Sequence, residues 1–524
     1  MAGHQLTGRD RASRSVYGPR LNGGSATGRR GSLRTAAIVV GLLTACGSAT
    51  QHSGTRGSTE QRVQAFESSL TEPSYTLADG HVQPRMRLRD RMTVYQVPGV
   101  SIAVINQGRI EWARGYGVTT AGGGEPVTTG TVFQAGSISK PLAATGALML
   151  VDRGVLRLDD DVRHALASWR LPESDASRVA PVTIRNILSH CAGFTVHGFS
   201  GYEQGQPLPT LTQVLGGLPP ANSEPIRIDT VPGTRWRYSG GGYTVLQQIV
   251  VDATGRPFES FMEDAVLATL GMRNSTFRQP LPSSFAVRAA RGHTGNGEVE
   301  PGGWHTYREM AAAGLWTTPS DLARFAIALH HAWAGDPGAL LARGLAKEML
   351  TRQCGHWGLG LQLEGDGSAA RFEHAGRNVG FTSQLIASVD GQWGAVVMTN
   401  GYGGTDLIRE IVQSLAAVYG WPGVLAQRRA SIMVATVQLD MVTGTYRFAD
   451  DDDLVVTREG TDLFTQRTGG PRRRVFAVSA TEFFYASRPA EIAFLRVTDG
   501  KAQEVEYRSG GEVETAHRIG GGPR

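Results

Sequence analysis

The sequence predicts an α/β fold, in which an antiparallel sheet is flanked by helices and interrupted by a helical insertion, followed by a C-terminal all-β domain. Strand-like apolar segments lie near both ends of the central part of the chain, at residues 99–118 and 381–399, and a long helix-rich stretch separates them. From about residue 441 the pattern changes to short alternating strands. Strands at both ends of one body are expected to share a sheet, and the change of pattern indicates a second domain.

The length and charge of the chain set the first limits on its function. With 524 residues, 40% of them hydrophobic, it is long enough for two or three domains with sizeable cores. Its sequence pI is about 9.2, but residues 1–45 alone carry seven Arg and one Asp. The formal charge of +5 therefore leaves about −1 for the rest of the chain. This distribution predicts no basic surface and argues against nucleic acid as a partner.

The basic N-terminus has the pattern of an export signal. Arg29, Arg30 and Arg34 precede an apolar run at residues 36–43, which is too short to span a bilayer. The run ends in Leu43-Thr44-Ala45-Cys46, which resembles the bacterial lipobox. We expect residues 1–45 to be a lipoprotein signal peptide, Cys46 to carry the lipid, and the protein to be exported and membrane-anchored, facing the cell exterior or periplasm. The alternative is an ordinary signal peptide in which Cys46 is incidental.

The Ser/Gly/Thr-rich residues 46–61 are expected to form a flexible tether before the main body of the chain, which occupies residues 62–422. The body opens with helix-like sequence through Met92. Hairpins are predicted across residues 106–108 and across Asp390-Gly391, because turn residues there separate apolar runs. The expected strands are 99–105, 109–118, 381–388 and 393–399, and residues 405–419 are an expected closing amphipathic helix.

The C-terminal domain, residues 441–520, is expected to be a small β-sandwich or barrel. Its predicted strands are residues 444–448, 453–458, 462–466, 474–478, 482–485, 490–497 and 504–509. In the body, Cys191 and Cys354 are far apart in sequence. Outside the cytosol they either pair or remain as two buried thiols, and the sequence leaves both open.

The chemistry of the chain begins at Ser137 and Lys140. Gly136 and the small residue before it indicate a turn, and Ser137 lies in the first turn of a helix that extends to Gly154. Residues three apart share a helix face, so Lys140 can reach the Ser137 hydroxyl. The whole chain has three lysines and 49 arginines. A desolvated lysine can release its proton and act as a base, whereas arginine cannot, which favours a catalytic role for Lys140. The alternative interpretation is a solvated helix face.

Two further segments carry candidate site residues. Tyr238 precedes Gly240-Gly241-Gly242 and helix-like residues 244–254, where its phenol can shuttle a proton beside Ser137. His374 and Gly376 lie on a predicted strand edge and share a face by period-two alternation. Taken alone, a packing tyrosine and a structural histidine are the commoner interpretations.

Together these motifs resemble the serine β-lactamase and penicillin-binding-protein superfamily, most closely its class C branch. Ser-x-x-Lys, a tyrosine before a Gly-rich helix start, and His-x-Gly on a late strand occur here in the order and rough spacing of that superfamily. Flanking segments at residues 97–104, 187–194 and 314–323 agree, and the resemblance covers about residues 85–420. It implies a β-lactamase/transpeptidase-like fold and a serine hydrolase. It also gives His190 a structural role, so we leave His190 out of the site.

The resemblance implies a role for each matching residue. Ser137 is the acylated nucleophile, Lys140 the acylation base and Tyr238 the partner acid/base, although the order of proton transfer between the last two stays open. The backbone N–H groups of Ser137 and Arg377 form the oxyanion hole, and His374 and Gly376 border the substrate. The sequence contains no metal-ligand cluster and no phosphate loop in a suitable context, so we expect no metal and no cofactor.

Two departures from the motifs of the superfamily narrow the substrate. Its Tyr-x-Asn is Tyr238-Ser239-Gly240 here, which removes a side-chain amide, and its Lys-Thr-Gly is His374-Ala375-Gly376, which removes a fixed ammonium and a hydroxyl. Both changes weaken recognition of an anionic substrate. We therefore expect a carboxylesterase or D-amino-acid peptidase, with a β-lactamase or D,D-carboxypeptidase as the alternative.

A small-molecule ester, peptide or β-lactam is the expected substrate, and the oligomeric state stays open. A hypothesis of another class is a non-catalytic binding lipoprotein with the same fold. Loss of Ser137, Lys140 or Tyr238 would favour it, and all three are present.

Overall fold

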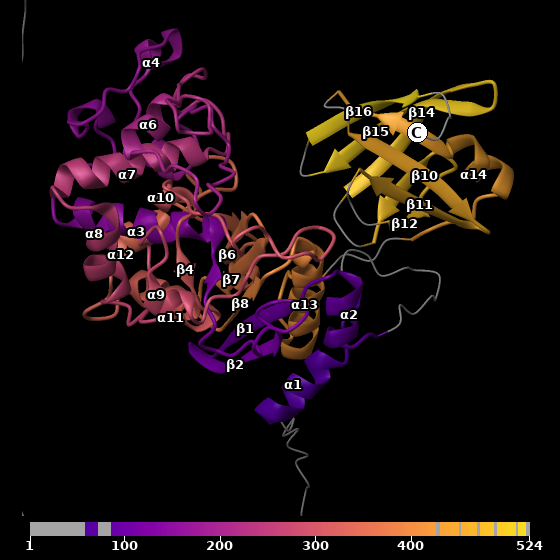
Figure 1. Ribbon diagram of the computed structural model, residues 1–524, viewed down its shortest axis with the longest axis horizontal. Helices are drawn as coiled ribbons and strands as arrows, with labels where there is room; N and C mark the ends of the chain where they lie inside the picture. Colours follow the sequence, from indigo (N-terminus) through magenta and orange to yellow (C-terminus); the bar gives the residue numbers. More distant parts are fainter. Residues whose placement is uncertain are drawn as a thin grey trace, which may run out of the picture. The chain divides into compact units, whose positions relative to one another are not determined.

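The computed structural model describes residues 58–71, 85–425, 430–449, 452–468, 472–486, 490–509 and 512–519 (Figure 1). The predicted signal peptide, Cys46 and most of the predicted tether lie outside these residues. Among the helices in the described ranges, none combines the length and the apolar character that crossing a bilayer requires.

The centre of the body is a six-stranded antiparallel sheet with the order β2-β1-β8-β7-β6-β5 (Figure 1). Its strands are β1 (Gly99–Asn106), β2 (Arg109–Gly117), β5 (Gln362–Glu364), β6 (Arg371–Asn378), β7 (Phe381–Ser388) and β8 (Trp393–Thr399). Pairing of β1 with β8 joins the two ends of the body, for example at Val104 and Ala395. The α/β fold and both predicted hairpins are therefore confirmed. A separate two-stranded sheet contains β3 (Phe133–Gln134) and β4 (Trp316–Thr317).

The sheet is buried on both faces because its central strands are apolar on both. On β1, Ile102 and Val104 belong to the core cluster that includes α13, whereas Ala103 and Ile105 belong to the cluster of the helical region. Helix α13 (Gly404–Tyr419), predicted almost to the residue, packs on β7 and β8. Helix α11 (Pro319–Ala334) belongs to the cluster of the helical region and packs on the opposite face of the sheet. Each face thus has its own helical cover.

The helical insertion surrounds two helices that are buried almost throughout, α3 (Ser139–Asp152) and α7 (Gly240–Thr254), which pack against each other. Apolar residues around most of their circumference explain this burial. The other helices of this part are η2 (Val162–His164), α4 (Asp175–Val179), α5 (Ile184–Leu188), α6 (Leu211–Gly216), α8 (Phe258–Met262), η3 (Glu263–Leu267), α9 (Ser283–Ala286), α10 (Met310–Ala313), α12 (Arg343–Met349) and η4 (Gly367–Ala369).

The start of the body differs from its prediction. The segment expected to be the end of a flexible tether forms the beginning of α1 (Thr59–Glu67), where Ser58 and Gln61 make a reciprocal capping box. Val63 and Phe66 of α1 are fully buried beside α13. The helix-like sequence expected at the start of the body is thus present, but it begins three residues earlier than the predicted boundary at residue 62. The Ser, Thr and Gly content before that boundary is also typical of flexible linkers, so composition alone placed the start of the helix in the tether. Helix α2 (Leu88–Val94) follows before β1.

The C-terminal domain is a closed barrel in which β9 pairs with both β10 and β16. Its strands are β9 (Gly444–Arg447), β10 (Asp453–Glu459), β11 (Asp462–Arg467), β12 (Arg473–Ala477), β13 (Glu482–Tyr485), β14 (Ala490–Thr498), β15 (Lys501–Ser509) and β16 (Glu512–Ile519), preceded by α14 (Thr436–Val442). The seven predicted strands are present. The closing strand β16 was missed because its sequence has no clear apolar alternation: Val513 is exposed, and the small residue Ala516 is buried in the barrel core.

Candidate active site

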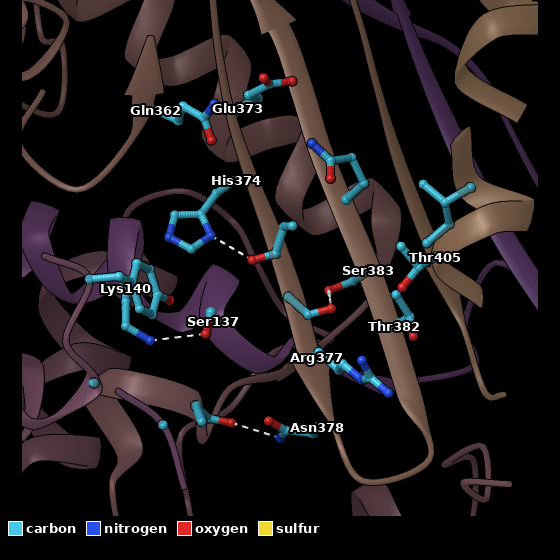
Figure 2. A pocket seen from close by; sticks show the side chains of 18 of the residues that line it. Ser137, Lys140, Gln362, Glu373, His374, Arg377, Asn378, Thr382, Ser383 and Thr405 are labelled. Carbon is cyan, nitrogen blue, oxygen red and sulfur yellow. Dashed lines mark hydrogen bonds between the residues drawn. The ribbon is translucent and has the colours of Figure 1, made fainter. Parts of the chain in front are cut away.

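Ser137 and Lys140 meet at the start of α3, as the motif predicted. Ser137 lies in the 3₁₀ turn η1 (Gly136–Ile138) that leads into the helix. The Lys140 Nζ donates a hydrogen bond to Ser137 Oγ at 2.9 Å (Figure 2). It donates a second hydrogen bond to the Ala312 carbonyl at 2.8 Å. The neighbouring hydroxyl of Ser139 points elsewhere, because it donates to Gly136 O and accepts from Leu315 N–H.

Burial determines the electrostatics of Lys140. Its side chain is 2% exposed, and desolvation lowers the pKa of its amine from the usual 10.5 to about 7. A substantial fraction of the amine is therefore neutral at neutral pH. A neutral amine that lies within hydrogen-bond distance of a serine hydroxyl has the position and the basicity of a general base.

Tyr238 lies two residues before α7, with its ring against Lys140 and His190. Lys140 Nζ is 5.0 Å from the ring centroid, and the His190 ring centroid is 4.2 Å away. Burial raises the pKa of the Tyr238 phenol well above its usual value, and a hydrogen bond with Ser137 opposes that shift. The phenol is therefore protonated at neutral pH, and it can pass its proton on as it receives another from a neighbouring group.

Two glycines allow β6 to approach the turn that carries Ser137. Gly136 has φ of +54°, and a Cβ there would lie 2.5 Å from the backbone nitrogen of Arg377. A Cβ at Gly376 would lie 1.9 Å from the Ala135 carbonyl oxygen. Any side chain at either position would separate the strand from the turn. The close approach brings the Arg377 backbone next to the Ser137 turn, where an oxyanion-hole N–H is needed.

The β6 strand divides its side chains between two environments. Phe372, His374, Gly376 and Asn378 are buried on the Ser137 side, whereas Arg377 is exposed and its guanidinium lies 4.1 Å from the Tyr402 ring centroid. In Figure 2, the Arg377 side chain points away from Ser137. Arg377 is thus placed to contribute its backbone N–H, rather than its guanidinium charge, to the site around Ser137.

His374 is a neutral residue in this site. Burial, followed by the nearby charge of Lys140, lowers the pKa of its imidazole to about 3. Its Nδ1 lies 2.6 Å from the Ala375 carbonyl oxygen, which requires the proton to be on Nδ1. Its buried Nε2 has no hydrogen-bond partner among the residues that the structure describes.

Three aromatic residues at the site were not selected from the sequence. The first is His190, whose Nδ1 accepts a hydrogen bond from Ser239 N–H at 3.2 Å while its ring packs on Tyr238. The others are Trp357, which contacts the rings of Tyr238 and His374, and Trp236, which stacks on Trp357. The sequence signal for them was weak: Trp236 lies two residues before Tyr238, and Trp357 lies in a Gly-rich stretch.

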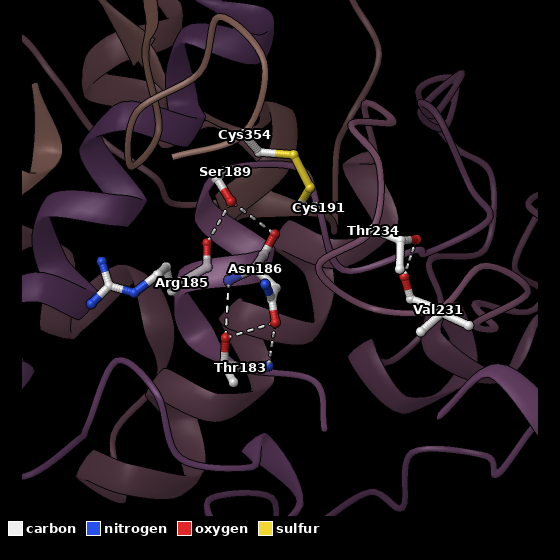
Figure 3. Close-up of a disulfide and its surroundings, with 8 residues drawn as sticks. All are labelled: Thr183, Arg185, Asn186, Ser189, Cys191, Val231, Thr234 and Cys354. Carbon is white, nitrogen blue, oxygen red and sulfur yellow. Dashed lines mark hydrogen bonds between the residues drawn. A yellow bond between two sulfur atoms is a disulfide. The ribbon is translucent and has the colours of Figure 1, made fainter. Parts of the chain in front are cut away.

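A disulfide settles the pairing that the sequence left open. Cys191 is bonded to Cys354, with Cα atoms 6.2 Å apart (Figure 3). The bond joins the loop of His190, which follows α5, to the loop that carries Trp357. It therefore connects two segments that contact Tyr238 from different parts of the chain.

The site opens into a cleft of about 1830 Å³. Its lining includes Ser137, Lys140, Tyr238, His374, Gly376 and Arg377. The structure thus brings together every site residue predicted in the body of the chain. Cys46, the predicted lipidation residue, lies outside the described residues.

Comparison with known proteins identifies relatives of this chain. A family model described as Beta-lactamase matches residues 85–418. Penicillin-binding protein 4 of Amycolatopsis lactamdurans is 28% identical over 359 residues, which cover 64% of this chain and 91% of that protein. Esterase EstB of Burkholderia gladioli is 32% identical over 209 residues, which cover 38% of this chain and 51% of the esterase. The octameric penicillin-binding protein homologue from Pyrococcus abyssi has the same fold, with a TM-score of 0.55 and 20% identity over 82% of this chain and 98% of that one.

Proposed function

The chain belongs to the beta-lactamase family and is a serine hydrolase, and we propose that it is a carboxylesterase that works through an acyl-enzyme on Ser137. The observation that carries this proposal is the contact between Lys140 and Ser137. The amine is buried, lies 2.9 Å from the hydroxyl, and has a pKa of about 7. A serine with an adjacent base is the arrangement that acyl transfer requires.

In the acylation step, Lys140 Nζ accepts the hydroxyl proton as Ser137 Oγ bonds to the substrate carbonyl carbon. The carbonyl electron pair moves to its oxygen, and the N–H groups of Ser137 and Arg377 stabilise the resulting oxyanion. Lys140 is a better proton acceptor here than Tyr238, because Tyr238 is protonated at neutral pH. The high pKa of the phenol thus supports Lys140 as the base.

Collapse of the tetrahedral intermediate breaks the bond to the leaving alcohol. Tyr238 donates its phenolic proton to the departing oxygen and recovers one from the Lys140 ammonium. Water then takes the place of the alcohol, and it passes a proton through Tyr238 to Lys140 as its oxygen bonds to the acyl carbon. When the bond from that carbon to Ser137 Oγ breaks, Lys140 returns the proton to Ser137 and the carboxylic acid leaves. Both half-reactions use the same three side chains.

The surroundings of Ser137 favour an uncharged acyl donor. Gly240 has no side chain with which to hold a substrate amide, and the Ser239 hydroxyl is used within the protein, donating to Val196 O and accepting from Gly242 N–H. His374 is neutral rather than cationic. Each lost charge-assisted hydrogen bond is worth roughly 1.5–3 kcal/mol, so two would lower β-lactam reactivity by about two to four orders of magnitude.

The proposal is tested by labelling and kinetics on one preparation. A fluorophosphonate should label Ser137, as located by mass spectrometry of peptides, and Ser137→Ala should abolish both labelling and ester hydrolysis. Short-chain esters should exceed benzylpenicillin and nitrocefin in kcat/KM. Preference for D-aminoacyl amides would instead indicate the D-amino-acid peptidase, and preference for nitrocefin or D-Ala-D-Ala peptides the β-lactamase or D,D-carboxypeptidase. A folded protein without labelling at Ser137 would favour the non-catalytic lipoprotein.

We also propose that the protein is exported and anchored by a lipid on Cys46, on the basis of the basic residues, apolar run and lipobox-like segment. The mature protein should begin at a lipid-modified Cys46 and partition into detergent. Cys46→Ser should release it into the aqueous phase or stop its processing. An unlipidated mature chain from the wild-type gene would contradict the anchor.

A further inference from the structure

A continuous aromatic surface leads from the catalytic tyrosine to the mouth of the cleft. It consists of Tyr238, His374, Trp357 and Trp236, which we call the aromatic shelf. The Trp357 ring centroid is 5.2 Å from that of His374, 5.8 Å from that of Tyr238 and 6.0 Å from that of Trp236. Trp236 is 42% exposed, although most large aromatic side chains in the described part of the chain are buried. All four shelf residues line the cleft.

The position of Tyr238 determines which part of a substrate meets the shelf. In the proposed reaction, the Tyr238 hydroxyl gives its proton to the departing alcohol oxygen, so that oxygen must lie within hydrogen-bond distance of it. The group attached to that oxygen then extends along the rings that adjoin Tyr238. The shelf therefore borders the leaving group rather than the acyl chain.

The charge around the shelf favours an uncharged group. The four residues that β6 turns towards Ser137 are Phe372, His374, Gly376 and Asn378, and His374 is neutral because burial and Lys140 lower its pKa to about 3. The charged residues of this strand alternate with them and face the other side. A carboxylate on the leaving group would therefore lose its hydration without gaining a fixed positive charge from β6. The amine of Lys140, which lies against the Tyr238 ring, already donates to Ser137 Oγ and to the Ala312 carbonyl.

The shelf is preformed because both of its tryptophans lie on constrained loops. The backbone of Trp357 exchanges hydrogen bonds with Cys354, at 3.0 and 3.2 Å, and Cys354 is bonded to Cys191. The residue after Trp236, Arg237, donates its N–H to the His190 carbonyl at 2.8 Å. A preformed aromatic surface binds a flat ring with little loss of conformational entropy.

We propose that the aromatic shelf is the leaving-group subsite and that Trp236 and Trp357 select esters with an uncharged aromatic leaving group. This inference rests on the proposed function, because it requires acylation of Ser137. It adds a preference for the leaving group of the ester, which Ser137, Lys140 and the oxyanion hole do not determine.

The test compares two acetate esters, 2-naphthyl acetate and hexafluoroisopropyl acetate. Their leaving groups are similarly acidic, but one is aromatic, and both produce the same acetyl-enzyme. Trp236→Ala should lower kcat/KM for the naphthyl ester about five- to tenfold, because an aromatic stacking contact is lost, and should leave kcat/KM for the fluorinated ester nearly unchanged. The rate of hydrolysis of the preformed acetyl-enzyme should not change, since the leaving group has already departed.

Trp333→Ala is the matched control, because Trp333 stacks on His330 outside the lining of the cleft. It removes a partly buried indole and should leave the ratio of the two kcat/KM values unchanged. Trp236→Phe should restore most of the wild-type ratio. If Trp236→Ala does not fold, Trp236→Phe is compared with wild type instead. The ratio of kcat/KM for the naphthyl ester to that for the fluorinated ester should then fall by a smaller but measurable amount.

A second arm uses wild-type enzyme with methyl 3-acetoxybenzoate and with 3-acetoxybenzoate. The neutral ester should be preferred at least about tenfold, as expected when an anion is desolvated without a partner. The subsite would be overturned by an unchanged naphthyl-to-fluoroalkyl ratio in Trp236→Ala, or in Trp236→Phe if the alanine variant does not fold. It would also be overturned by slower hydrolysis of the acetyl-enzyme in that variant, or by equal use of the neutral and the anionic ester by the wild-type enzyme. Failure of the proposed function has a different result, which is no acetyl-enzyme at Ser137 with either acetate.

Discussion

At the scale of single residues, the proposed chemistry depends on the protonation state of Lys140. A base whose pKa is lowered to about 7 loses its proton as the pH rises through that value. The rate of Ser137 labelling should therefore rise between about pH 6 and 8 and then level off. The measurement is the fluorophosphonate labelling rate against pH under single-turnover conditions. A rate that is flat over this range would contradict deprotonation of Lys140 as the activating step.

Lys140→Arg tests the same residue by substitution. Arginine preserves the positive charge and approximate reach but does not release its proton, so acylation should fall by about two orders of magnitude or more. Circular dichroism and a thermal melt establish that the variant is folded. Near wild-type labelling in a folded Lys140→Arg protein would show that Lys140 has an electrostatic or structural role instead.

Glu309 is a second buried titratable residue, and because it does not line the cleft we expect it to affect stability rather than the reaction. It is fully buried, its carboxyl accepts a hydrogen bond from the Tyr202 hydroxyl at 3.3 Å, and burial raises the pKa of the carboxyl from 4.5 to about 7. Because the folded state holds this proton more tightly than the unfolded state, its stabilising contribution is complete below about pH 4.5. That contribution is lost as the pH rises through about 7.

Glu309→Gln removes this pH dependence, since glutamine stays neutral. The stability of the variant relative to wild type should therefore increase from pH 5 to pH 8, by at most about 3 kcal/mol. Thermal unfolding midpoints at the two pH values measure the change. Glu298→Gln, at an exposed position, should show no such pH-dependent difference. An equal effect of Glu309→Gln at both pH values would mean that the carboxyl has the same charge throughout.

The residues predicted from sequence are those whose chemistry follows from local spacing. Ser137 and Lys140 are one helical turn apart, and His374 and Gly376 share a strand face, so local geometry predicts both pairs. Trp357 and His190 are different, because they meet Tyr238 through contacts between loops that are distant from one another in the sequence. Spacing contains no information on such contacts. The aromatic shelf therefore required the structure.

At the scale of elements, the disulfide connects the loops around Tyr238. It closes a segment of 163 residues, for which the chain-entropy estimate is about 5 kcal/mol, an upper value for a single bond. Cys354→Ser should lower the melting temperature of the oxidised protein and reduce kcat/KM for esters, because the Trp357 loop loses its covalent anchor. Cys191→Ser and the double variant are the controls.

All three variants should have the same melting temperature if the bond itself is responsible for the effect. Reduced wild-type protein should resemble them. A much greater loss in one single variant would indicate that packing of that side chain, rather than the bond, provides the stability.

Elements were predicted well where their periodicity was strong. The hairpin strands and α13 have clear patterns, and the structure places them within a residue or two of their predicted bounds. The first turn of α1, which was assigned to the tether, and strand β16 were missed for related reasons. In each, polar residues predominate and few side chains are buried. The local pattern of apolar residues therefore does not predict the conformation of these segments, which depends on tertiary packing.

At the scale of the whole molecule, the hydrolase and the barrel each have their own hydrophobic core. The two clusters of the body contain described residues no later than Trp421, and Val424 packs against the cluster that includes α13. The barrel cluster contains residues from Leu439 to Ala516, with Val434 packed on it. A segment with its own core is expected to fold alone. We therefore propose residues 62–422 and 441–520 as separate domains, with α1 extending the first towards its N-terminus.

A chain that ends at Leu425 tests this division. It retains the hydrogen bond from Gln413 Nε2 to the Val424 carbonyl, which attaches the last described residues of the body to α13. We expect it to fold, to melt cooperatively and to label at Ser137 at close to the full-length rate, because every predicted catalytic residue lies before the end of α13. A chain of residues 430–520 should fold as a β-rich domain under the same conditions. If the shorter hydrolase is soluble, monomeric and folded, yet unlabelled, then the barrel contributes to the reaction and the two domains are a single functional unit.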